Sequence, residues 1–360
     1  MNLKQINPSK ILIVNIFGIG DVLFTTPLIR NLHHHFPNAT IDYMSSRRAA
    51  PILEEHSKIR KVHIYERDEF NAVKKRSKIE FIKKVNQFVQ MIKSEKYDIL
   101  FDFSMNQMFN VISNFTNIKT RIGFNYKNRS RFLTKKINLK GFQEKHVVQY
   151  YLDLLSDCGL ETVHQEMDVT ISQAHHDWVE QYLRANKINK DKPMIGIFPG
   201  GGSSWGKSAN SKRWSQENYI KLIHKIVENY PVQTILMGDQ TEEKLCEEIV
   251  RKCPNIYKSF GQTNLGQSLA LLSRCQAVIC NDGGPLHMAV AAGTNTVSMF
   301  GPVDQRVYGP WSNKKKHHVV VSDISCRPCY RHFRMSDCTH LSCLNKINVD
   351  DVFNKVRLVL

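Results

Sequence analysis

The feature that most constrains the fold is the apolar run at residues 11–16, which leads through Gly18 and Gly20 to Asp21. An apolar run of this length that ends in a glycine turn is typical of the first, buried strand of a parallel sheet. The pattern predicts a strand, a turn and a helix that begins near Asp21. The turn would present a carboxylate and several backbone N–H groups at the carboxyl edge of the sheet, where open α/β sheets bind their ligands.

The same turn fits the first two positions of the dinucleotide-binding pattern G-x-G-x-x-G, but the third position is Leu23. Asp42 stands at about the right distance for an acid that binds ribose. It falls inside the second expected strand, at residues 39–44, rather than at its end. The spacing therefore disfavours an NAD-dependent enzyme. For Asp21 the residues alone leave two interpretations open, a functional carboxylate and a helix N-terminal cap.

The chain has 360 residues, of which 42% are apolar and 23% charged, which is enough for two globular domains. Its apolar runs fall short of the roughly 18–20 residues that span a bilayer. The N-terminal run ends in an acid and lacks a small-residue cleavage site, so we expect a protein that is not exported. Nine cysteines, an odd number, then favour reduced thiols in the cytoplasm.

The net charge is +17, and residues 119–145 alone hold nine Lys or Arg side chains against one Glu. Such a stretch is most often a solvated basic face. Its field would also attract a polyanion or an anionic membrane surface. The stretch contains no recognisable nucleic-acid module, and its aromatic residues fit strand packing as well as base stacking, so we do not expect nucleic acid as the partner.

Alternating strands and helices predict an α/β protein with parallel sheets. The first half shows strands at 11–16, 39–44, 60–65, 97–103 and 120–124 and helices at 71–93 and 146–159. The second half shows strands at 194–198, 233–238, 277–280 and 296–300 and helices at 173–186, 242–252, 264–275 and 286–292. We predict domains at 1–168 and 169–347, with a helix at 348–360 that packs back across the join. Two similar facing domains would form a ligand cleft.

Two loops in the second half have the composition of phosphate-binding turns. The first holds Gly200, Gly201, Ser203 and Ser204 and is followed by Lys207, Lys212 and Arg213. Glycines allow close backbone approach, and cations neutralise charge. The second is Asn-Asp-Gly-Gly at residues 281–284. Either loop alone is more often a structural turn, but the two together favour a diphosphate-containing ligand such as a nucleotide-sugar.

Three further features each have two interpretations. Glu242 is placed to accept ribose hydroxyls or to serve as an acid at a helix N-terminus. His287 would contact a phosphate or cap a helix. The cysteines with the spacing C-x2-C-x8-C-x4-C are Cys326, Cys329, Cys338 and Cys343. Four thiolates can close a structural zinc or iron site, but the middle spacing is short for a zinc ribbon, and buried free thiols are the alternative.

The chain contains, in order, FGIGDVLFTTPLIRNLHHHFPNATID, then IFPGGG followed by SKRWSQENY, then NDGGPLHMAVAAGTNTVSMFGPVD. These blocks resemble glycosyltransferase family 9, the heptosyltransferases that build the inner core of bacterial lipopolysaccharide. The resemblance implies the GT-B architecture, an α/β fold of two facing Rossmann-like domains with an interdomain cleft, in which the second domain holds most of the donor. It also implies an inverting transfer that requires no metal or other cofactor for catalysis.

Residue by residue, the resemblance gives Asp21 the role of general base, on the acceptor side with Gly18 and Gly20. Lys212 matches a lysine beside the diphosphate, Glu242 the acid that holds ribose, and Asp282 the acid at the donor sugar. The backbone N–H groups of Gly283 and Gly284 would face phosphate, with Ser203, Ser204 and His287 nearby. Many relatives have Thr or Ser where this chain has Gly283, so a hydroxyl is absent there.

The resemblance implies transfer of a heptose or related sugar from an ADP-sugar to a lipopolysaccharide core or related glycan. A membrane-bound anionic glycolipid would then be attracted to the basic first domain at the inner membrane face. Two other functions stay open. One is a transferase that uses another nucleotide-sugar, and the other is a nucleotide- or polyanion-binding protein without catalysis.

Overall fold

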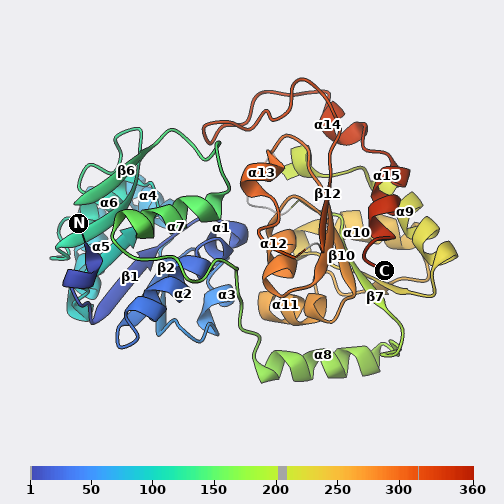
Figure 1. The fold of residues 1–360 in the computed structure, drawn as a ribbon, viewed down its shortest axis with the longest axis horizontal. Coiled ribbons are helices and arrows are strands. Elements are labelled where there is room, and N and C mark those ends of the chain that lie inside the picture. Colours follow the sequence, from blue (N-terminus) through green and yellow to red (C-terminus); the bar gives the residue numbers. More distant parts are fainter. Residues whose placement is uncertain (1, 202–208, 315) are drawn as a thin grey trace. The chain divides into compact units, whose positions relative to one another are not determined.

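The computed structural model describes residues 2–201, 209–314 and 316–360. The chain divides into two compact units. Unit 1 is Met1–Phe142 with Val147–Gln165, and unit 2 is Gln143–His146 with Glu166–Leu360. Each unit contains one six-stranded sheet whose strands are all parallel (Figure 1).

The sheet of unit 1 has the order β3-β2-β1-β4-β5-β6. Its strands are β1 (Lys10–Val14), β2 (Thr40–Ser45), β3 (Lys61–Ile64), β4 (Ile99–Asp102), β5 (Thr120–Tyr126) and β6 (Lys135–Leu139). Its helices are η1 (Leu3–Gln5), α1 (Ile19–Leu23), α2 (Thr26–His35), α3 (Pro51–Glu54), α4 (Arg67–Arg76), α5 (Lys78–Glu95), α6 (Gln107–Ser113) and α7 (Val147–Asp157).

Helices cover both faces of this sheet, which explains why β1 is apolar throughout. Leu12 and Val14 on one face belong to a core that includes Phe88 of α5. On the other face, the ring of Phe103, which follows β4, lies 4.7 Å from the ring of Tyr151 in α7. Because successive residues of a strand face opposite sides, a sheet buried on both faces needs an unbroken apolar run. The expectation of a buried strand in a parallel sheet at this position is confirmed, and the structure places that strand between β2 and β4.

The sheet of unit 2 has the order β12-β11-β10-β7-β8-β9. Its strands are β7 (Met194–Phe198), β8 (Gln233–Leu236), β9 (Tyr257–Lys258), β10 (Ala277–Asn281), β11 (Asn295–Met299) and β12 (His317–Val320). Its helices are α8 (Gln173–Ala185), α9 (Gln216–Asn229), η3 (Gln240–Glu242), α10 (Glu243–Lys252), α11 (Leu265–Ser273), α12 (Gly284–Ala291), α13 (Gln305–Tyr308), α14 (Ser342–Asn345) and α15 (Val349–Val356). The last helix, α15, buries Val352, Phe353 and Val356 in the core of this unit.

The two sheets share one topology. Counted from the first strand of each unit, both have the strand order 3-2-1-4-5-6, in which the chain direction across the sheet reverses between strands 1 and 4. That reversal lies between β1 and β4 in unit 1 and between β7 and β10 in unit 2. Doubly wound sheets of this order bind ligands beyond the carboxyl ends of the two strands at the reversal point.

The structure differs from the sequence-based expectations at three places. One helix was expected at 71–93, which is wrong because Ser77, with φ −153° and ψ 123°, separates α4 from α5. Its side chain accepts a hydrogen bond from the N–H of Glu80 and so caps α5. The edge strands β6 and β12, with the sequences KKINL and HHVV, were not expected. Among the described residues, no helix combines the length and apolarity needed to cross a bilayer.

Candidate functional site

The loop after β7 approaches its neighbours so closely that two positions accept only glycine. A Cβ atom on Gly200 would lie 1.6 Å from Oε1 of Glu242, and one on Gly201 would lie 2.8 Å from the carbonyl oxygen of Ala209. The glycines thus allow this loop to fold against η3 and against the segment that leads to α9. Ser203 and Ser204, which were predicted to belong to the same loop, lie outside the described residues.

A buried asparagine at the end of β10 holds this loop in place. The side-chain amide of Asn281 donates hydrogen bonds to the carbonyl oxygens of Pro199 and Gly200, both at 2.9 Å. Its Oδ1 accepts from the backbone N–H of Trp214 at 3.0 Å. One side chain therefore joins the ends of β7 and β10 to the start of the α9 region. Sequence analysis treated Asn281 only as part of a turn.

An ion pair lies at this reversal point. The ammonium nitrogen of Lys212 is 2.7 Å from Oδ2 of Asp282, and both side chains are buried. A Cβ atom on Gly283, the next residue, would lie 3.4 Å from the carbonyl oxygen of Gly201. Gly284 begins α12. The structure therefore brings together Gly201, Lys212, Asp282 and Gly283, which were predicted from separate motifs.

Glu242 takes one of the two roles that its position allowed, that of an acid at a helix start. Its carboxylate accepts a hydrogen bond from the N–H of Asp239 at 3.3 Å in a capping box at η3. The same carboxylate borders Gly200, and the guanidinium of Arg213 lies 3.6 Å from its Oε1. The side chain is thus a helix-start acid that also forms one wall of the β7 loop.

Two buried histidines interact with one another, and one of them, His287, also lies near the Lys212 charge. Burial lowers the pKa of His287 to about 3, with smaller contributions from His146 and Lys212. Burial also lowers the pKa of His146 to about 4, although its ring Nε2 donates a hydrogen bond to the carbonyl oxygen of Gly309 at 3.0 Å. Both imidazoles are therefore neutral near pH 7.

His146 was not identified from the sequence. It belongs to the short segment Gln143–His146, which clusters with unit 2 although unit 1 resumes at Val147. Its ring stacks on that of Trp311 with a centroid distance of 4.7 Å. A single histidine before a helix carries no motif, so only the path of the chain reveals its place beside the unit 2 residues.

In unit 1, Asp21 lies at the corresponding reversal point, after β1. Its Oδ2 accepts a hydrogen bond from the N–H of Gly18 at 3.1 Å, and the amide of Asn15 donates to its carbonyl oxygen at 3.0 Å. Helix α1 begins at Ile19, two residues before the predicted start, with Gly20 inside it. Asp21 therefore does cap a helix, and the buried Asn15 fixes the backbone that carries it.

Two buried phenols also face the Asp21 charge. Burial, with a smaller contribution from Asp21, raises the pKa of Tyr151 and of Tyr43 above the ordinary value for tyrosine. Both phenols are neutral at physiological pH. Asp21 thus has two neutral phenols among its electrostatic neighbours.

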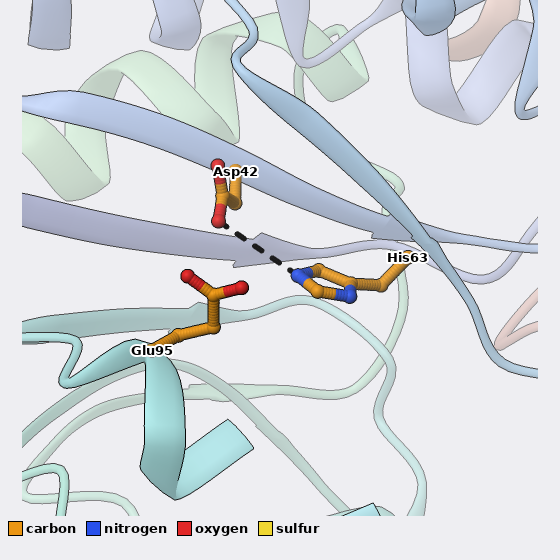
Figure 2. A group of neighbouring side chains, drawn as sticks. All are labelled: Asp42, His63 and Glu95. Atoms are coloured by element: carbon orange, nitrogen blue, oxygen red, sulfur yellow. Dashed lines mark ion pairs between the residues drawn. The ribbon is translucent and has the colours of Figure 1, made fainter. Parts of the chain in front are cut away.

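One cluster in unit 1 has the spacing of a metal site (Figure 2). Within the described residues, Asp42, His63 and Glu95 have ligand atoms that all lie within 4.8 Å of one another. The guanidinium of Arg60 forms ion pairs with both carboxylates of this cluster. Its Nε lies 2.9 Å from Oδ1 of Asp42, and its NH2 lies 2.7 Å from Oε2 of Glu95. Tyr97 donates a hydrogen bond to Asp42 at 2.5 Å.

This cluster is a structural ion network. Burial alone would raise the pKa of Asp42, but hydrogen bonds from His63, Arg60 and Tyr97 outweigh it and lower the pKa to about 2. Arg60 supplies the positive charge that a metal would supply. Asp42 is also the acid that a dinucleotide-binding site would need to bind ribose. Its hydrogen bonds within the network agree with the sequence argument against an NAD-dependent enzyme.

The four tail cysteines lie in the last part of unit 2. Cys326, Cys329 and Cys338 line a cavity of about 410 Å³ together with His340. Cys343 is buried in the neighbouring core. Burial, with smaller contributions from the charges of the other three cysteines, raises the pKa of Cys343 to about 11. The quartet is not among the described side-chain groups with ligand atoms within 4.8 Å of one another.

The fold and these residues define a doubly wound α/β protein with a glycine loop, a lysine and carboxylates at its ligand edges. A sequence model of glycosyltransferase family 9 (heptosyltransferase) matches residues 85–340. The chain belongs to this family and is a glycosyltransferase, as its three sequence blocks predicted.

Three comparisons describe its relatives. Lipopolysaccharide heptosyltransferase 3 of Escherichia coli is 24% identical over 299 residues, which cover 82% of this chain and 84% of that protein. The family 9 glycosyl transferase of Veillonella parvula has a TM-score of 0.79 at 18% identity, covering 98% of this chain and 97% of that one. Escherichia coli heptosyltransferase WaaC with ADP-2-deoxy-2-fluoro heptose has a TM-score of 0.72 at 15% identity, covering 98% and 100%. The predicted GT-B fold class is confirmed.

Proposed function

We propose that this protein transfers a heptose from ADP-heptose to a lipopolysaccharide core or related glycan. The observation that carries the proposal is the buried Lys212–Asp282 pair, 2.7 Å apart, at the reversal point of unit 2 beside the glycine loop. A cation, backbone N–H groups and a carboxylate at one sheet edge meet the needs of a diphosphate-linked sugar. The heptosyltransferase names of its relatives and the ADP-sugar bound to WaaC support the choice of donor.

The donor roles follow from charge and hydrogen-bonding capacity. An ammonium group has three N–H donors, so Lys212 can serve Asp282 and a diphosphate oxygen together. His287, being neutral, would contribute a hydrogen bond and no charge. Glu242 would accept the ribose hydroxyls, Asp282 would bind sugar hydroxyls, and the N–H groups of Gly283 and Gly284 would face phosphate. The predicted phosphate contacts of Ser203 and Ser204 complete this set.

In the proposed reaction, Asp21 is the general base. Its carboxylate takes the proton of the acceptor hydroxyl while that oxygen bonds to the anomeric carbon from the face opposite the diphosphate. The bond from the anomeric carbon to the diphosphate oxygen breaks, its electrons stay on ADP, and Lys212 stabilises that charge. The configuration inverts, and the step needs no metal or redox partner.

The acceptor would be an anionic glycolipid, so we place the protein in the cytoplasm, peripherally on the inner membrane face. The basic residues 119–145 support this placement. The structure divides them, because Lys127, Arg129 and Arg131 follow the carboxyl end of β5 whereas Lys135 and Lys136 begin β6. Only the first group shares the sheet edge that carries Asp21.

The tail cysteines are proposed as a structural zinc or iron site formed by Cys326, Cys329, Cys338 and Cys343. Three of the thiols share one cavity with His340, and thiolates that raise one another's pKa are the donors that a bound cation favours. The metal would brace the tail of unit 2 and take no part in transfer. Metal analysis of the purified protein and of Cys326→Ser tests this, and a metal-free wild type would refute it.

Donor identity is tested by thermal shift with ADP-, UDP-, GDP- and CMP-sugars, followed by an assay of nucleotide release with acceptor. We expect ADP-heptose to raise the melting temperature most and to yield ADP. Stabilisation by a different nucleotide-sugar would replace the donor but keep the transferase. Stabilisation by none of them would contradict the proposal.

A further inference from the structure

The α4–α5 hairpin of unit 1 presents two isoleucines to solvent. Ile79 and Ile82 are 69% and 65% exposed, and they lie three residues apart in the first turns of α5. Residues with that spacing share one face of a helix. Further along α5, Phe88, Val89 and Ile92 are buried in the core. The helix therefore packs with its second half and leaves an apolar pair uncovered on its first half.

Cations surround this pair. Lys74, Lys75, Lys78 and Lys83 are all exposed, and the only acid between residues 74 and 84 is Glu80. Arg76 engages Glu80, and Lys84 engages Glu69. No ion pair forms on Lys75, Lys78 or Lys83 among the described residues. The apolar pair is thus adjacent on α5 to the exposed Lys78 and Lys83 and follows the exposed lysines that end α4.

The hairpin points toward the edge of the sheet that carries Asp21. At its C-terminal end, Glu95 contacts Lys10 and Lys61, which begin β1 and β3 at the amino edge. A helix of the length of α5 is about 27 Å long, whereas a strand of the length of β4 spans about 13 Å. Because the helix of a parallel crossover runs back against the strands, its first turns extend beyond the carboxyl edge. In Figure 1, α4 and α5 lie beside the sheet of unit 1.

We propose that this face, made of Ile79, Ile82, Lys75, Lys78 and Lys83, seats the protein on an anionic lipid surface. Two apolar side chains would enter the headgroup region while the lysines bind lipid phosphates, which is how interfacial helices hold to membranes. A second copy of the chain is disfavoured as occupant, because a two-fold contact would bring the two sets of lysines together. The proposal rests on a membrane-bound acceptor, as proposed above.

Flotation of the full chain with vesicles tests this membrane-binding face. We expect binding to vesicles of phosphatidylethanolamine and phosphatidylglycerol and at least tenfold weaker binding to phosphatidylcholine. Ile79→Ser/Ile82→Ser should lower the partition coefficient at least tenfold. Lys75→Glu/Lys78→Glu/Lys83→Glu should lower it by a similar factor, with a strong dependence on salt.

Matched controls carry the same chemical changes elsewhere. Val163→Ser/Leu358→Ser replaces two other exposed apolar residues, 48% and 63% exposed, and Lys221→Glu/Lys244→Glu/Lys252→Glu lowers the net charge equally in unit 2. Both controls should bind vesicles like the wild type. Circular dichroism and melting temperature verify folding of every variant.

Three results would contradict the proposed membrane-binding face. They are no vesicle binding by the wild type, equal loss in the controls, and a change from dimer to monomer in Ile79→Ser/Ile82→Ser. Nucleotide release with a lipid-free acceptor separates this outcome from the proposed function. Turnover should be unchanged in these isoleucine and lysine variants. If the wild type turned over this acceptor but did not bind vesicles, the transferase function would stand and only the membrane-binding face would be refuted.

Discussion

At the scale of single residues, Asp21 has two roles that substitution can separate. It caps α1 by accepting the N–H of Gly18 at 3.1 Å, and we propose that it also deprotonates the acceptor. Asp21→Asn keeps an oxygen for the cap but is a far weaker base. We expect kcat to fall by about 10²–10⁴-fold, while the donor dissociation constant changes less than about threefold. Steady-state kinetics and calorimetric titration with donor measure both.

Asp21→Ala is the matched variant, because it removes the cap as well as the base. Its kcat should equal that of Asp21→Asn, while its free energy of unfolding should fall by a further ~0.5–2 kcal/mol. If instead turnover tracked stability across the two variants, Asp21 would be a cap alone. A tolerated Asp21→Asn would show that a group other than Asp21 deprotonates the acceptor.

Asp102, at the end of β4, should give the stability of the protein a distinct pH dependence. Burial raises its pKa to about 6, only partly offset by hydrogen bonds from Ser104. Below the unfolded pKa of about 4 both states are protonated and the buried acid costs nothing. As pH rises through 6 the folded state must hold an unfavourable charge, so stability is lost.

Asp102→Asn removes that loss. The free energy of unfolding of the variant minus that of the wild type should therefore increase by about 2–3 kcal/mol between pH 4 and pH 7. Urea denaturation at several pH values measures the difference, in which the other titrating groups cancel. A difference that stays constant or decreases with pH would show that folding does not raise the pKa of Asp102.

At the scale of elements, Asn281 connects three segments, and its removal should affect the donor more than the fold. Asn281→Ala deletes two hydrogen bonds at 2.9 Å to the β7 loop and one at 3.0 Å from Trp214. We expect the KM for the donor to rise at least tenfold, because the loop and the chain that bears Lys212 lose their shared anchor. The free energy of unfolding should also fall by about 1–3 kcal/mol.

Asn295→Ala is the control for that experiment. Asn295 begins the neighbouring strand β11, and its amide donates to the carbonyl of Val359 at 3.4 Å. Its loss should lower stability without changing the KM for the donor. Equal effects of the two substitutions on KM would mean that Asn281 acts only through general stability.

Some of the strands and helices could be predicted from the sequence, and others could not. The apolar run that forms β1 and the two glycines that follow it could be recognised in the sequence, because burial on two faces and close backbone approach leave few residue choices. Strands β6 and β12 were missed because strands at a sheet edge tolerate charged and polar side chains, as Lys135 and His317 illustrate. The break at Ser77 was missed because local capping overrode the helical periodicity on both sides.

The candidate site shows a similar division. Glycine loops and nearby cations predicted that Gly201, Lys212 and Asp282 serve one ligand, because parallel strands deliver their loops to a common edge. The anchoring role of Asn281 and the position of His146 depend on the path of the chain. No spacing in the sequence encodes a contact between Asn281 and Pro199, 82 positions apart.

At the scale of the whole molecule, the two units share one sheet topology but differ in the side chains at their reversal points. Both sheets have the same strand order, yet the reversal point of unit 2 holds glycines and the Lys212–Asp282 pair, whereas that of unit 1 holds the carboxyls of Asp21 and Asp102. The proposed roles therefore assign anion binding to unit 2 and base chemistry to unit 1. On this division the nucleotide alone should stabilise unit 2 selectively.

The chain offers a direct test, because all four tryptophans, Trp178, Trp205, Trp214 and Trp311, fall within Glu166–Leu360. Saturation with ADP at about 100 times its dissociation constant adds roughly 2.7 kcal/mol to the state that binds it. The unfolding midpoint followed by tryptophan fluorescence should then rise by about 5–10 °C. Amide hydrogen exchange should slow in β7 and β10 and stay unchanged in β1 and β4.

The matched control for this test is Lys212→Met/Asp282→Asn, which removes both charges and so leaves no unpaired ion in the core. It should fold, as judged by circular dichroism, and lose most of the ADP-induced rise in midpoint. A single Lys212→Met would instead lose about 3–5 kcal/mol through the stranded carboxylate, which would obscure the effect on binding. Protection of β1 and β4 equal to that of β7 and β10 would contradict a donor site built by unit 2, since linkage stabilises the segments that hold the ligand.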